Sequence, residues 1–385
     1  MSSSLHLLDS YLPRTETFIW QTLRALKRFP PLIAADRREN EGLFPLGEDA
    51  RFLDVTPSRS VLSRLKARVT GDFAPVRYAH EEGILASPAV RDAAVCHVHK
   101  GYRALVTRDF TRALGKPLVI NFYGSDVSQR AFLRRAGAGY RDLFARARFL
   151  LVEGPAMRER LVGLGAPEDR IRIQRIAIDP VDYPFRERSW DGNRALKLLF
   201  IGRLVDKKGL DVGLRALASG VGEASGVPWS LTVIGDGPRR AALEAQAAGL
   251  GLAARVRFVG YKSPADMRAA LDESDILLQP SRIAPDGDSE GGAPTVILEA
   301  QASGLPVVTT DHDDIPFVTV SGRESPSAWI APQGDAEGLA ALMKRAVDDH
   351  AAWGAMGRAG RAKIEADHDI ARVVPALEDL YAAAS

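Results

Sequence analysis

The sequence LKLLFIGRLVDKKGL, residues 196–210, carries the pattern that decides the fold. Its apolar run from Leu196 to Ile201 predicts a buried strand, Gly202 opens a loop, and a helical pattern begins after Gly209. Strand, glycine-containing loop and helix in this order are typical of βαβ units. The same order recurs along the chain, which predicts an α/β protein with parallel sheets.

Other apolar or β-branched runs alternate with segments of helical period on both sides of this stretch. The remaining predicted strands are Leu5–Leu8, Leu32–Ala34, Val95–Val98, Leu118–Phe122, Phe149–Val152, Ser230–Ile234, Val256–Val259, Ile276–Leu278 and Pro306–Thr309. Predicted helices include Thr17–Lys27, Ser128–Ala147 and Ile370–Ala384.

The length of 385 residues predicts two domains, since a domain commonly holds roughly 100–200 residues. Residues 178–196 contain two prolines and an Asp-Gly-Asn turn signal with little periodicity, which is typical of a boundary. We therefore expect domains at residues 1–185 and 186–368. Residues 369–385 are expected to form a helix that packs back on the first domain.

The composition is that of a folded protein, with 46% apolar and 26% charged residues. Its single cysteine, Cys96, excludes an intrachain disulfide framework and a cysteine-rich metal cluster. The N-terminal residues lack the signal-peptide pattern, and no run of ~18 apolar residues occurs. We expect a cytoplasmic protein that does not span a membrane and does not bind nucleic acid; peripheral binding at the inner face of the membrane is left open.

The charges are divided unevenly along the chain. Residues 1–190 hold 31 Lys and Arg against 22 Asp and Glu, a formal charge of +9, whereas the remaining residues hold 20 against 27, a charge of −7. A basic first half favours an anionic partner such as a membrane surface or a phosphate-bearing acceptor. An arginine-rich solvated surface is the equally open alternative.

The loop after Ile201 contains two cations, Arg203 and Lys208, five residues apart. Ligands of parallel α/β sheets bind at the carboxyl ends of strands, and Gly202 allows a close approach to the backbone there. Arg and Lys suit a diphosphate and would stabilise a nucleoside diphosphate as it leaves. The alternative is a solvated loop of charges.

A Gly-x-Gly pattern follows the next strand, at Gly235 and Gly237. The third glycine of a dinucleotide motif is missing, and no acidic ribose ligand can be assigned after it. A nicotinamide-dependent enzyme is therefore not expected.

The strongest signal is the sequence DSEGGAPTVILEA, residues 288–300, a glycine-rich loop that enters a helix near Pro294. Free N–H groups at a helix N-terminus suit a phosphate or a sugar hydroxyl. Glu290 in the loop and Glu299 inside the helix are placed to accept hydrogen bonds from hydroxyls. Either glutamate alone also fits a structural role, because acidic residues complement the helix dipole.

These residues resemble those of glycosyltransferase family 4, whose members are retaining enzymes of the GT-B fold, with two Rossmann-like domains facing a central cleft. The resemblance covers nearly the whole chain and is most specific from Leu196 to Thr310. The matching positions are Gly202, Arg203, Leu204, Lys208 and Gly209 in the first loop, Gly235 to Pro238 in the second, and Glu299, Ala300, Gly304, Pro306 and Val307 beyond the donor loop.

The resemblance implies roles for individual residues on the donor side. Arg203 and Lys208 would hold the diphosphate, Glu290 would contact the transferred sugar, and Glu299 would bond the ribose. The catalytic residues expected in this way are Arg203, Lys208, Glu290 and Tyr123. The expected donor-binding residues are Gly202, Gly235, Gly260, Tyr261, Gly291, Gly292, Ala293, Pro294, Thr295 and Glu299.

Three segments of the first half resemble the family's acceptor side: PRTETFI (13–19), HVHKG (97–101) and NFYGSD (121–126). The acceptor-side residues expected from them are Thr15, Glu16, His99, Gly124 and Asp126. For Asp126 we favour holding the Tyr123 loop in shape over positioning the acceptor, because an Asp so near a glycine often bonds its own backbone.

The chain departs from the family at two places. Eight residues separate Glu290 from Glu299, where the family usually has seven, which makes the role of Glu299 safer. Tyr123 stands where the family commonly has His. A neutral Tyr can donate a hydrogen bond to a sugar hydroxyl or phosphate, but the chemistry cannot then depend on an imidazolium.

His97 and His99 point to the same face of their strand, which makes a metal pair conceivable. No third ligand has convincing spacing, so core packing or active-site lining is favoured. The resembled family needs no metal or other cofactor besides the nucleotide-diphosphate sugar that serves as co-substrate.

The expected function is transfer of a hexosyl unit, with retention of configuration, to a glycan or lipid-linked acceptor in cell-surface polysaccharide synthesis. Closure of the two domains would exclude water, and attack on the face of departure is favoured because no enzymic nucleophile stands out. The alternatives are a GT-B epimerase or hydrolase and a noncatalytic sugar-nucleotide-binding protein.

Overall fold

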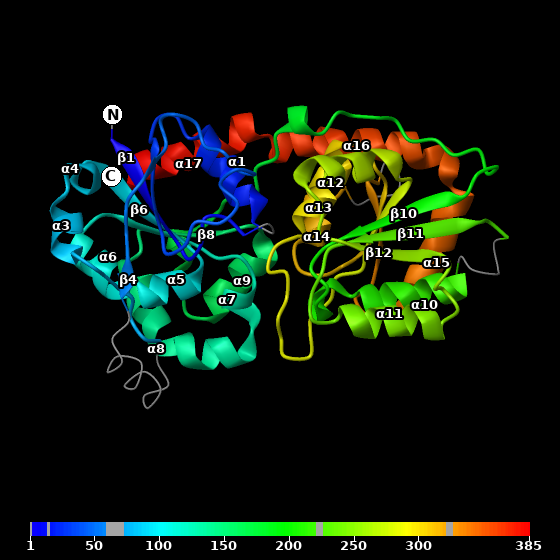
Figure 1. The fold of residues 1–385 in the computed structure, drawn as a ribbon, viewed down its shortest axis with the longest axis horizontal. Helices are drawn as coiled ribbons and strands as arrows, with labels where there is room; N and C mark the ends of the chain where they lie inside the picture. The colour runs from blue at the N-terminus through cyan, green and yellow to red at the C-terminus, as the bar shows by residue number, and fades with distance from the viewer. Residues whose placement is uncertain (1, 14–15, 59–72, 221–225, 321–325) are drawn as a thin grey trace. The chain divides into compact units, whose positions relative to one another are not determined.

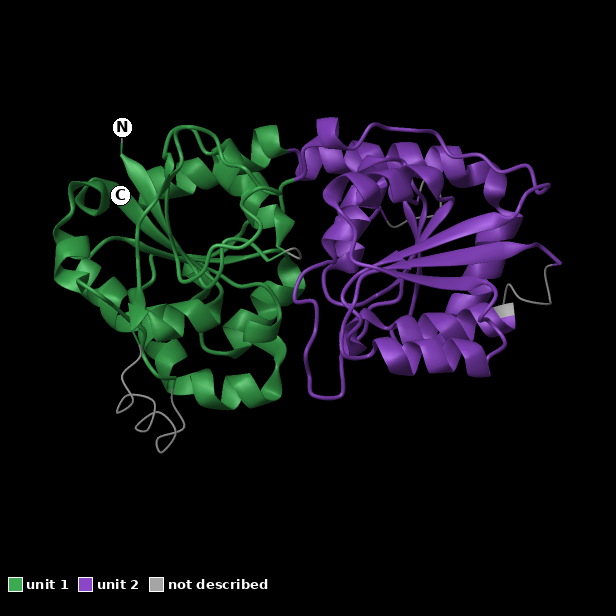
Figure 2. Cartoon of the chain, in the orientation of Figure 1, with its two compact units in different colours: residues 1–177, 370–385 green, residues 178–369 purple. Residues whose placement is uncertain are grey.

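The computed structural model describes residues 2–13, 16–58, 73–220, 226–320 and 326–385. The chain forms two compact units (Figure 2). Unit 1 comprises residues 1–177 and 370–385, and unit 2 comprises residues 178–369. Residues 370–385, at the C-terminus, are thus grouped with unit 1.

The division between the units lies eight residues before the predicted position, because residues 178–185 belong to unit 2. The N–H group of Ile178 donates to the main-chain oxygen of His368 at 2.8 Å. The Arg361 guanidinium donates to the main-chain oxygen of Tyr183, also at 2.8 Å. The prolines and charges of this segment therefore mark a strap bound to unit 2 and not a free linker.

Unit 1 contains a seven-stranded sheet in the order β3-β2-β1-β6-β7-β8-β9, and its strand pairs are parallel (Figure 1). The strands are β1 (Ser3–Leu8), β2 (Pro31–Ala35), β3 (Arg51–Phe52), β6 (Ala93–His99), β7 (Leu118–Asn121), β8 (Phe149–Val152) and β9 (Ile171–Ile173); β4 (Pro57–Ser58) and β5 (Arg77–Tyr78) form a separate antiparallel pair. The helices are α1 (Thr17–Ala25), α3 (Glu81–Ala86), α4 (Pro88–Arg91), α5 (Gly101–Val106), α6 (Arg108–Leu114), α7 (Ser125–Ser128), α8 (Arg130–Arg146), α9 (Pro155–Gly163) and α17 (Ile370–Ala384).

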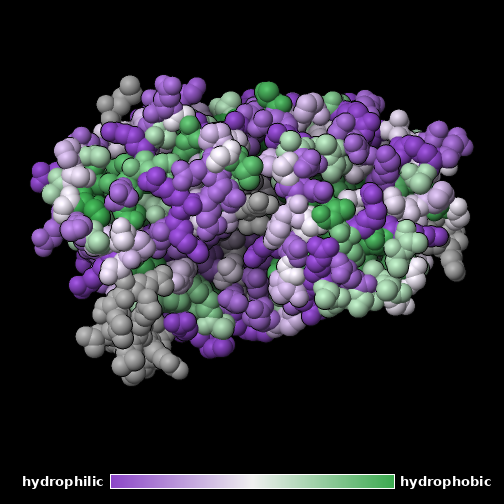
Figure 3. All heavy atoms as spheres, in the orientation of Figure 1, coloured by the Kyte–Doolittle hydropathy of each residue, from purple (hydrophilic) through white to green (hydrophobic). Residues whose placement is uncertain are grey.

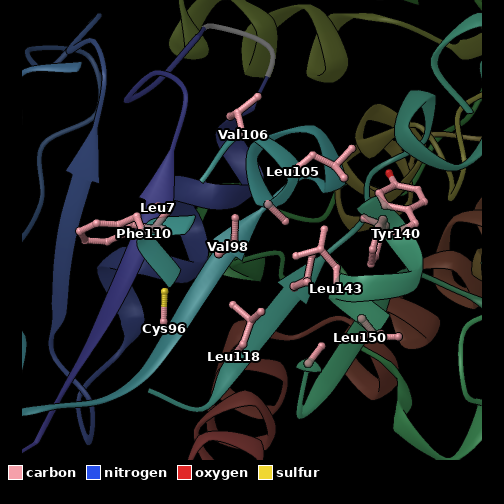
Figure 4. Close-up of a cluster of buried hydrophobic side chains, with 14 of the residues drawn as sticks. Leu7, Cys96, Val98, Leu105, Val106, Phe110, Leu118, Tyr140, Leu143 and Leu150 are labelled. Atoms are coloured by element: carbon pink, nitrogen blue, oxygen red, sulfur yellow. The ribbon is translucent and has the colours of Figure 1, made fainter. Parts of the chain in front are cut away.

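Both faces of this sheet are covered by helices, because alternate residues of its strands are apolar on both sides. Figure 4 shows one core, in which Leu7, Val98 and Leu118 of the strands lie close to Leu105 of α5 and Leu143 of α8. The core on the other face includes Ile19 of α1, Ile33, Val119, and Leu377 and Tyr381 of α17.

Unit 2 contains a six-stranded parallel sheet in the order β12-β11-β10-β13-β14-β15 (Figure 1). The strands are β10 (Leu196–Ile201), β11 (Trp229–Ile234), β12 (Val256–Gly260), β13 (Ile276–Gln279), β14 (Val307–Thr310) and β15 (Ala328–Ala331). The helices are α10 (Leu210–Gly220), α11 (Arg240–Gly249), α12 (Pro264–Glu273), α13 (Thr295–Ala302), α14 (Ile315–Val318), α15 (Ala336–Asp348) and α16 (Trp353–Asp367).

The α/β class is confirmed, and each strand predicted from the sequence is present within two residues of its predicted bounds. Polar and charged side chains cover much of the face that Figure 3 shows, with apolar side chains scattered between them. Within the ranges given above, no helix has both the length and the apolar character that a membrane span requires.

Candidate active site

The loops after β10, β11 and β12 meet at one edge of the unit 2 sheet. The N–H group of Leu204 donates to the main-chain oxygen of Asp236 at 2.9 Å. Gly235 likewise donates to the main-chain oxygen of Gly260 at 2.9 Å. The structure therefore brings together three loops that the sequence analysis assigned to one donor site.

Two glycines allow the loop after β10 to lie close to the loops after β11 and β13. Gly235 has φ +127°, and a Cβ atom added there would lie 2.0 Å from the main-chain oxygen of Gly202. Gly209 has φ +65°, and its added Cβ would lie 1.8 Å from the main-chain oxygen of Pro280. Any side chain at either position would push apart the loops that carry the candidate residues.

Arg203 and Lys208 occupy different environments in the loop after β10. Arg203 is exposed, and its guanidinium has no hydrogen-bond or ion-pair partner among the described residues. Lys208 follows Asp206 and Lys207 in a single 3-10 turn, and its Nζ lies 2.9 Å from the Glu290 carboxylate. One cation is thus free to meet an anion, whereas the other is already paired.

Glu290 is fixed from two sides. Besides Lys208, the hydroxyl of Ser281 donates to Glu290 Oε1 at 2.9 Å. Burial favours the neutral carboxyl, but attraction by Lys208 and Lys207 outweighs it and lowers the pKa of Glu290. Burial lowers the pKa of Lys208, and Glu290 opposes this effect. At neutral pH the two side chains form an ion pair.

The glycine-rich loop is anchored by residues that the sequence analysis did not assign. The N–H group of Glu290 donates to His312 Nε2 at 3.1 Å, and that of Gly291 donates to Asp313 Oδ2 at 2.7 Å. His312 Nδ1 in turn lies 3.1 Å from Gln333 Oε1. His312 and Asp313 follow β14, and Gln333 follows β15. About twenty residues or more of sequence separate them from the loop, so no local motif predicts their role.

The loop leads into α13, whose first residues are those expected at the donor site. Gly291, Gly292 and Ala293 are buried, Pro294 precedes the helix, and Thr295 begins it. The N-cap residue, Pro294, provides no side-chain cap to this N-terminus. Its N–H groups and the positive end of the helix dipole are therefore available to an anion or a hydroxyl oxygen.

Glu299, in α13, is held by Tyr183 of the segment that the sequence analysis treated as a boundary. The Tyr183 hydroxyl donates to Glu299 Oε1 at 3.0 Å. Burial raises the pKa of Glu299, and this hydrogen bond opposes the rise. One carboxylate oxygen is thus engaged, while Oε2 has the capacity to accept from a ligand hydroxyl.

Tyr261 lies just beyond β12, next to Gly260. Its side chain is 46% exposed, and its hydroxyl donates to the main-chain oxygen of Asp236 at 3.3 Å. An exposed aromatic ring at the edge where the three loops meet is suited to stacking or to covering a planar base.

The candidate residues of unit 1 gather after β6 and β7. Asp126 accepts from the N–H groups of Gly101 at 2.8 Å and Tyr123 at 3.0 Å, and so fixes the loop that contains Gly124. Glu16 forms an ion pair with Lys100. Thr15, the remaining acceptor-side candidate, lies outside the described residues.

His99 joins this group through Tyr123, whose hydroxyl lies 2.7 Å from His99 Nδ1. A third histidine, His6 on β1, was not predicted from the sequence; the strand register places it opposite His97. Ligand atoms of His6, His97 and His99 lie within 4.8 Å of one another. His6 is more than ninety residues from His97 and His99 in sequence, and the pairing of β1 with β6 brings it close to them.

Comparisons with known proteins identify sequence relatives and structures of similar fold. A sequence model of the family described as glycosyl transferases group 1 matches residues 195–349. The chain is 33% identical over 313 residues to the amylovoran biosynthesis glycosyltransferase AmsK of Erwinia amylovora, covering 79% of this chain and 75% of that protein. It is 32% identical over 260 residues to the putative colanic acid biosynthesis glycosyltransferase WcaL of Salmonella typhimurium, covering 67% and 62%.

Solved structures share the fold at lower sequence identity. Anabaena HepE, in complex with UDP and glucose, has a TM-score of 0.77 and 15% identity over 99% of this chain and 100% of its own. Sucrose-phosphate synthase from Thermosynechococcus elongatus has a TM-score of 0.76 and 16% identity, with both chains covered completely.

Proposed function

The chain belongs to the glycosyl transferases group 1 family and is a glycosyltransferase of the GT-B fold class, and on this premise we propose that it transfers a hexosyl unit from a nucleotide-diphosphate sugar, with retention of configuration. Unit 2 binds the donor and unit 1 binds the acceptor in this proposal.

The observation that carries the donor assignment is the guanidinium of Arg203 at the sheet edge of unit 2. It is exposed and has no partner among the described residues, whereas Lys208 in the same loop is paired. A diphosphate offers several anionic oxygens, which match a planar guanidinium fork and a neighbouring ammonium. The uncapped N-terminus of α13 adds further N–H donors. The HepE structure contains UDP, so UDP-sugars are the first donors to test.

The chemistry follows from these charges. As the sugar–phosphate bond breaks, negative charge grows on the leaving nucleoside diphosphate, and Arg203 and Lys208 stabilise it. Glu290, already ionised and fixed by Ser281, accepts hydrogen bonds from hydroxyls of the transferred sugar. Glu299 accepts from the ribose through the oxygen that Tyr183 leaves free.

The acceptor is proposed from the two relatives. AmsK is named for amylovoran biosynthesis and WcaL for colanic acid biosynthesis. We propose that this enzyme likewise extends a glycan or lipid-linked acceptor of a cell-surface polysaccharide. The only cysteine, Cys96, is buried and unpaired, which is compatible with a reducing compartment, and we propose the cytoplasm.

A thermal-shift screen against nucleotide-diphosphate sugars tests the donor assignment. A ligand at 100 times its Kd adds about 2.7 kcal/mol to the stability of the form that binds it. We expect one donor and its nucleoside diphosphate to raise Tm in the wild type and to lose this effect in Arg203→Ala. The matched control is Arg345→Ala, an exposed arginine on α15, which should respond like the wild type.

Two outcomes would contradict the proposal. If Arg203→Ala keeps the full shift with a nucleoside diphosphate, the diphosphate does not bind after β10. If the bound donor is broken down equally fast with and without a glycan acceptor, the enzyme is a hydrolase and not a transferase.

A further inference from the structure

A continuous chain of hydrogen bonds runs from Tyr123 into the interior of unit 1. The Tyr123 hydroxyl lies 2.7 Å from His99 Nδ1, and His99 Nε2 lies 3.0 Å from His6 Nδ1. His6 Nε2 lies 2.9 Å from Ser4 Oγ, which is 2.9 Å from the main-chain oxygen of Phe29. We call Tyr123, His99, His6 and Ser4 the relay.

The inner end of the relay fixes the direction of every hydrogen bond in it. The carbonyl oxygen of Phe29 can only accept, so the single hydroxyl proton of Ser4 points to it. Ser4 Oγ must therefore accept from His6 Nε2–H, which leaves a neutral His6 with its lone pair on Nδ1. His6 Nδ1 can then only accept, and it accepts from His99 Nε2–H.

The same reasoning reaches Tyr123. His99 donates through Nε2, so its neutral ring has its lone pair on Nδ1. That lone pair accepts the Tyr123 hydroxyl proton. Burial is the main cause that lowers the pKa of His6 and of His99, and the adjacent histidines lower it further because two charged rings would repel each other, which agrees with neutral rings. Burial and the nearby carboxylate of Glu153 raise the pKa of Tyr123, which agrees with a protonated hydroxyl.

The third histidine of the cluster has separate partners. The Tyr381 hydroxyl lies 2.5 Å from His97 Nδ1, and His97 Nε2 lies 2.8 Å from Asn121 Oδ1. All six ring nitrogens of His6, His97 and His99 are therefore engaged in hydrogen bonds within the protein. Three free imidazole lone pairs do not converge on one point, so the cluster is not arranged to bind a metal ion.

We infer that His99, His6 and Ser4 are positioning residues that turn the Tyr123 hydroxyl proton inward and make Tyr123 a hydrogen-bond acceptor for a sugar hydroxyl. The Tyr123 residue is partly exposed, and the inference places a ligand hydroxyl at its oxygen. A phosphate oxygen has no proton to offer such a partner, whereas a sugar hydroxyl has one. The identity of the hydroxyl rests on the proposed function, but the direction of the relay does not.

The direction is tested without any ligand, by the ¹⁵N shifts of the imidazole nitrogens of the full-length protein at neutral pH. A protonated and an unprotonated ring nitrogen give clearly different shifts. We expect His6, His97 and His99 each to be protonated at Nε2 and unprotonated at Nδ1. A proton on His99 Nδ1 overturns the inference whatever the enzyme transfers.

The variant Ser4→Ala tests whether the inner end sets the direction. Without the serine, His6 Nε2–H would be buried with no acceptor, so the opposite tautomer is favoured and the relay reverses. We expect His99 then to be protonated at Nδ1. Ser3→Ala is the matched control, because Ser3 is also buried on β1 and its hydroxyl has no partner among the described residues. Unchanged tautomers in Ser4→Ala overturn the role of Ser4.

The ligand is tested with the nucleotide sugar that gives the largest thermal shift, its nucleoside diphosphate, and a polyprenyl-linked oligosaccharide acceptor. We expect Tyr123→Phe and Ser4→Ala each to lower about tenfold either the affinity for the nucleotide sugar or kcat/KM for the acceptor. Tyr123→Phe removes the accepting oxygen, and Ser4→Ala makes that oxygen accept from His99 instead, so combining them should cause no further loss. A loss of affinity for the nucleotide sugar alone assigns the hydroxyl to the donor. A loss of kcat/KM for the acceptor at unchanged donor affinity assigns it to the acceptor.

The two proposals fail in different ways. If Tyr123→Phe changes neither the affinity for the nucleotide sugar nor kcat/KM for the acceptor, the proposed sugar contact is wrong, even if Arg203→Ala abolishes donor binding. If no nucleotide sugar binds at all, the proposed function is wrong, and the tautomers still decide whether the relay exists.

Discussion

At the scale of single residues, the ion pair between Lys208 and Glu290 combines a structural and a functional role. Their side chains are only 14% and 7% exposed, and Nζ lies 2.9 Å from the carboxylate. Removing one partner of such a pair leaves a buried charge without its main counter-charge, which costs about 3–5 kcal/mol. Removing both partners together costs far less, because no buried charge remains.

We therefore predict that Lys208→Met lowers the unfolding free energy of unit 2 by about 3 kcal/mol, and that adding Glu290→Gln restores most of it. Urea denaturation of the four variants of this double-mutant cycle measures the effect. Arg203→Ala is the control, since Arg203 is exposed and should leave stability unchanged. Additive losses in the double variant would contradict the prediction.

The residues that the sequence analysis identified are those that local sequence specifies. Arg203, Lys208, Glu290 and Glu299 lie in loops whose glycines and flanking strand are contiguous with them. The residues it missed act on them from a distance in sequence. Tyr183, which holds Glu299, is 116 residues away from it, and no periodicity relates such positions.

Tyr123 gives a sharper example of what sequence alone does not contain. Its identity suggested that it could donate a hydrogen bond to a ligand. The hydrogen-bond relay through His99 and His6 indicates instead that its proton is already used. The direction of the Tyr123 hydrogen bond depends on the further partners of His99 and His6. These follow from the pairing of β1 with β6, which the local sequence does not specify.

At the scale of elements, the turn between Lys208 and α10 depends on a glycine that meets two requirements at once. Gly209 has φ +65°, and its added Cβ would also meet the main-chain oxygen of Pro280 at 1.8 Å. Gly251 has a similar φ of +74°, but nothing lies within 4 Å of its added Cβ. The two positions therefore separate backbone strain from steric overlap.

We predict that Gly251→Ala costs about 1–2 kcal/mol, the cost of a left-handed conformation for an L-residue. Gly209→Ala should cost clearly more, because the backbone at Pro280 must also move. It should in addition weaken nucleotide binding, since the turn positions Lys208. Thermal unfolding and nucleotide titration measure both effects, and equal stability losses in the two variants would contradict the steric argument.

The strands could be predicted because a parallel sheet covered by helices on both faces has strands that are nearly continuous apolar runs. β10 was predicted with its observed bounds, Leu196–Ile201. The sequence analysis did not identify β9, Ile171–Ile173, which has three residues and a central arginine. It also did not identify β15, Ala328–Ala331, whose two alanines carry little β propensity. Pairing with a neighbouring strand, and not local preference, makes these segments strands.

At the scale of the whole molecule, the buried histidines link the stability of unit 1 to pH. Burial lowers the pKa of His97 from 6.5 to about 4, and it lowers the pKa of His6 and His99 in the same direction. The unfolded chain binds a proton on His97 near pH 6.5, whereas the folded chain does not until about pH 4. Because the unfolded chain binds more protons between these pH values, the unfolding free energy has its full value above pH 6.5 and decreases as the pH falls toward 4.

We predict that His97 alone removes about 3 kcal/mol of unfolding free energy over this range, from a shift of 1.36 kcal/mol per pKa unit. Denaturant unfolding followed between pH 7.5 and 4.5 measures the loss. His97→Asn should reduce the slope of this dependence, to which His6 and His99 still contribute, whereas His80→Asn, at an exposed position, should retain the wild-type slope. A wild-type stability that does not change between pH 6.5 and 4.5 would rule out neutral, desolvated histidines.

Unit 1 is not one continuous stretch of the chain, because it includes a helix that follows unit 2 in sequence. α17 contributes Val373, Val374 and Leu377 to the unit 1 core. Its Glu378 carboxylate accepts from the main-chain N–H groups of Lys27 and Arg28 at 2.8 and 2.6 Å, after the end of α1. Unit 2, by contrast, has a sheet and a core formed entirely within residues 178–369.

We predict that residues 178–369 fold cooperatively on their own and bind the nucleoside diphosphate, whereas residues 1–177 do not fold. Joining residues 370–385 to residue 177 through a few Gly and Ser residues should restore folding. A short linker suffices because Ile178 pairs with Asp369 in the intact chain, which keeps residues 177 and 370 near each other. Far-UV circular dichroism and urea unfolding of the three fragments measure this. Cooperative unfolding of residues 1–177 alone would mean that the core of unit 1 forms without α17. The buried contacts of Tyr381 and Glu378 would then contribute little to the stability of unit 1.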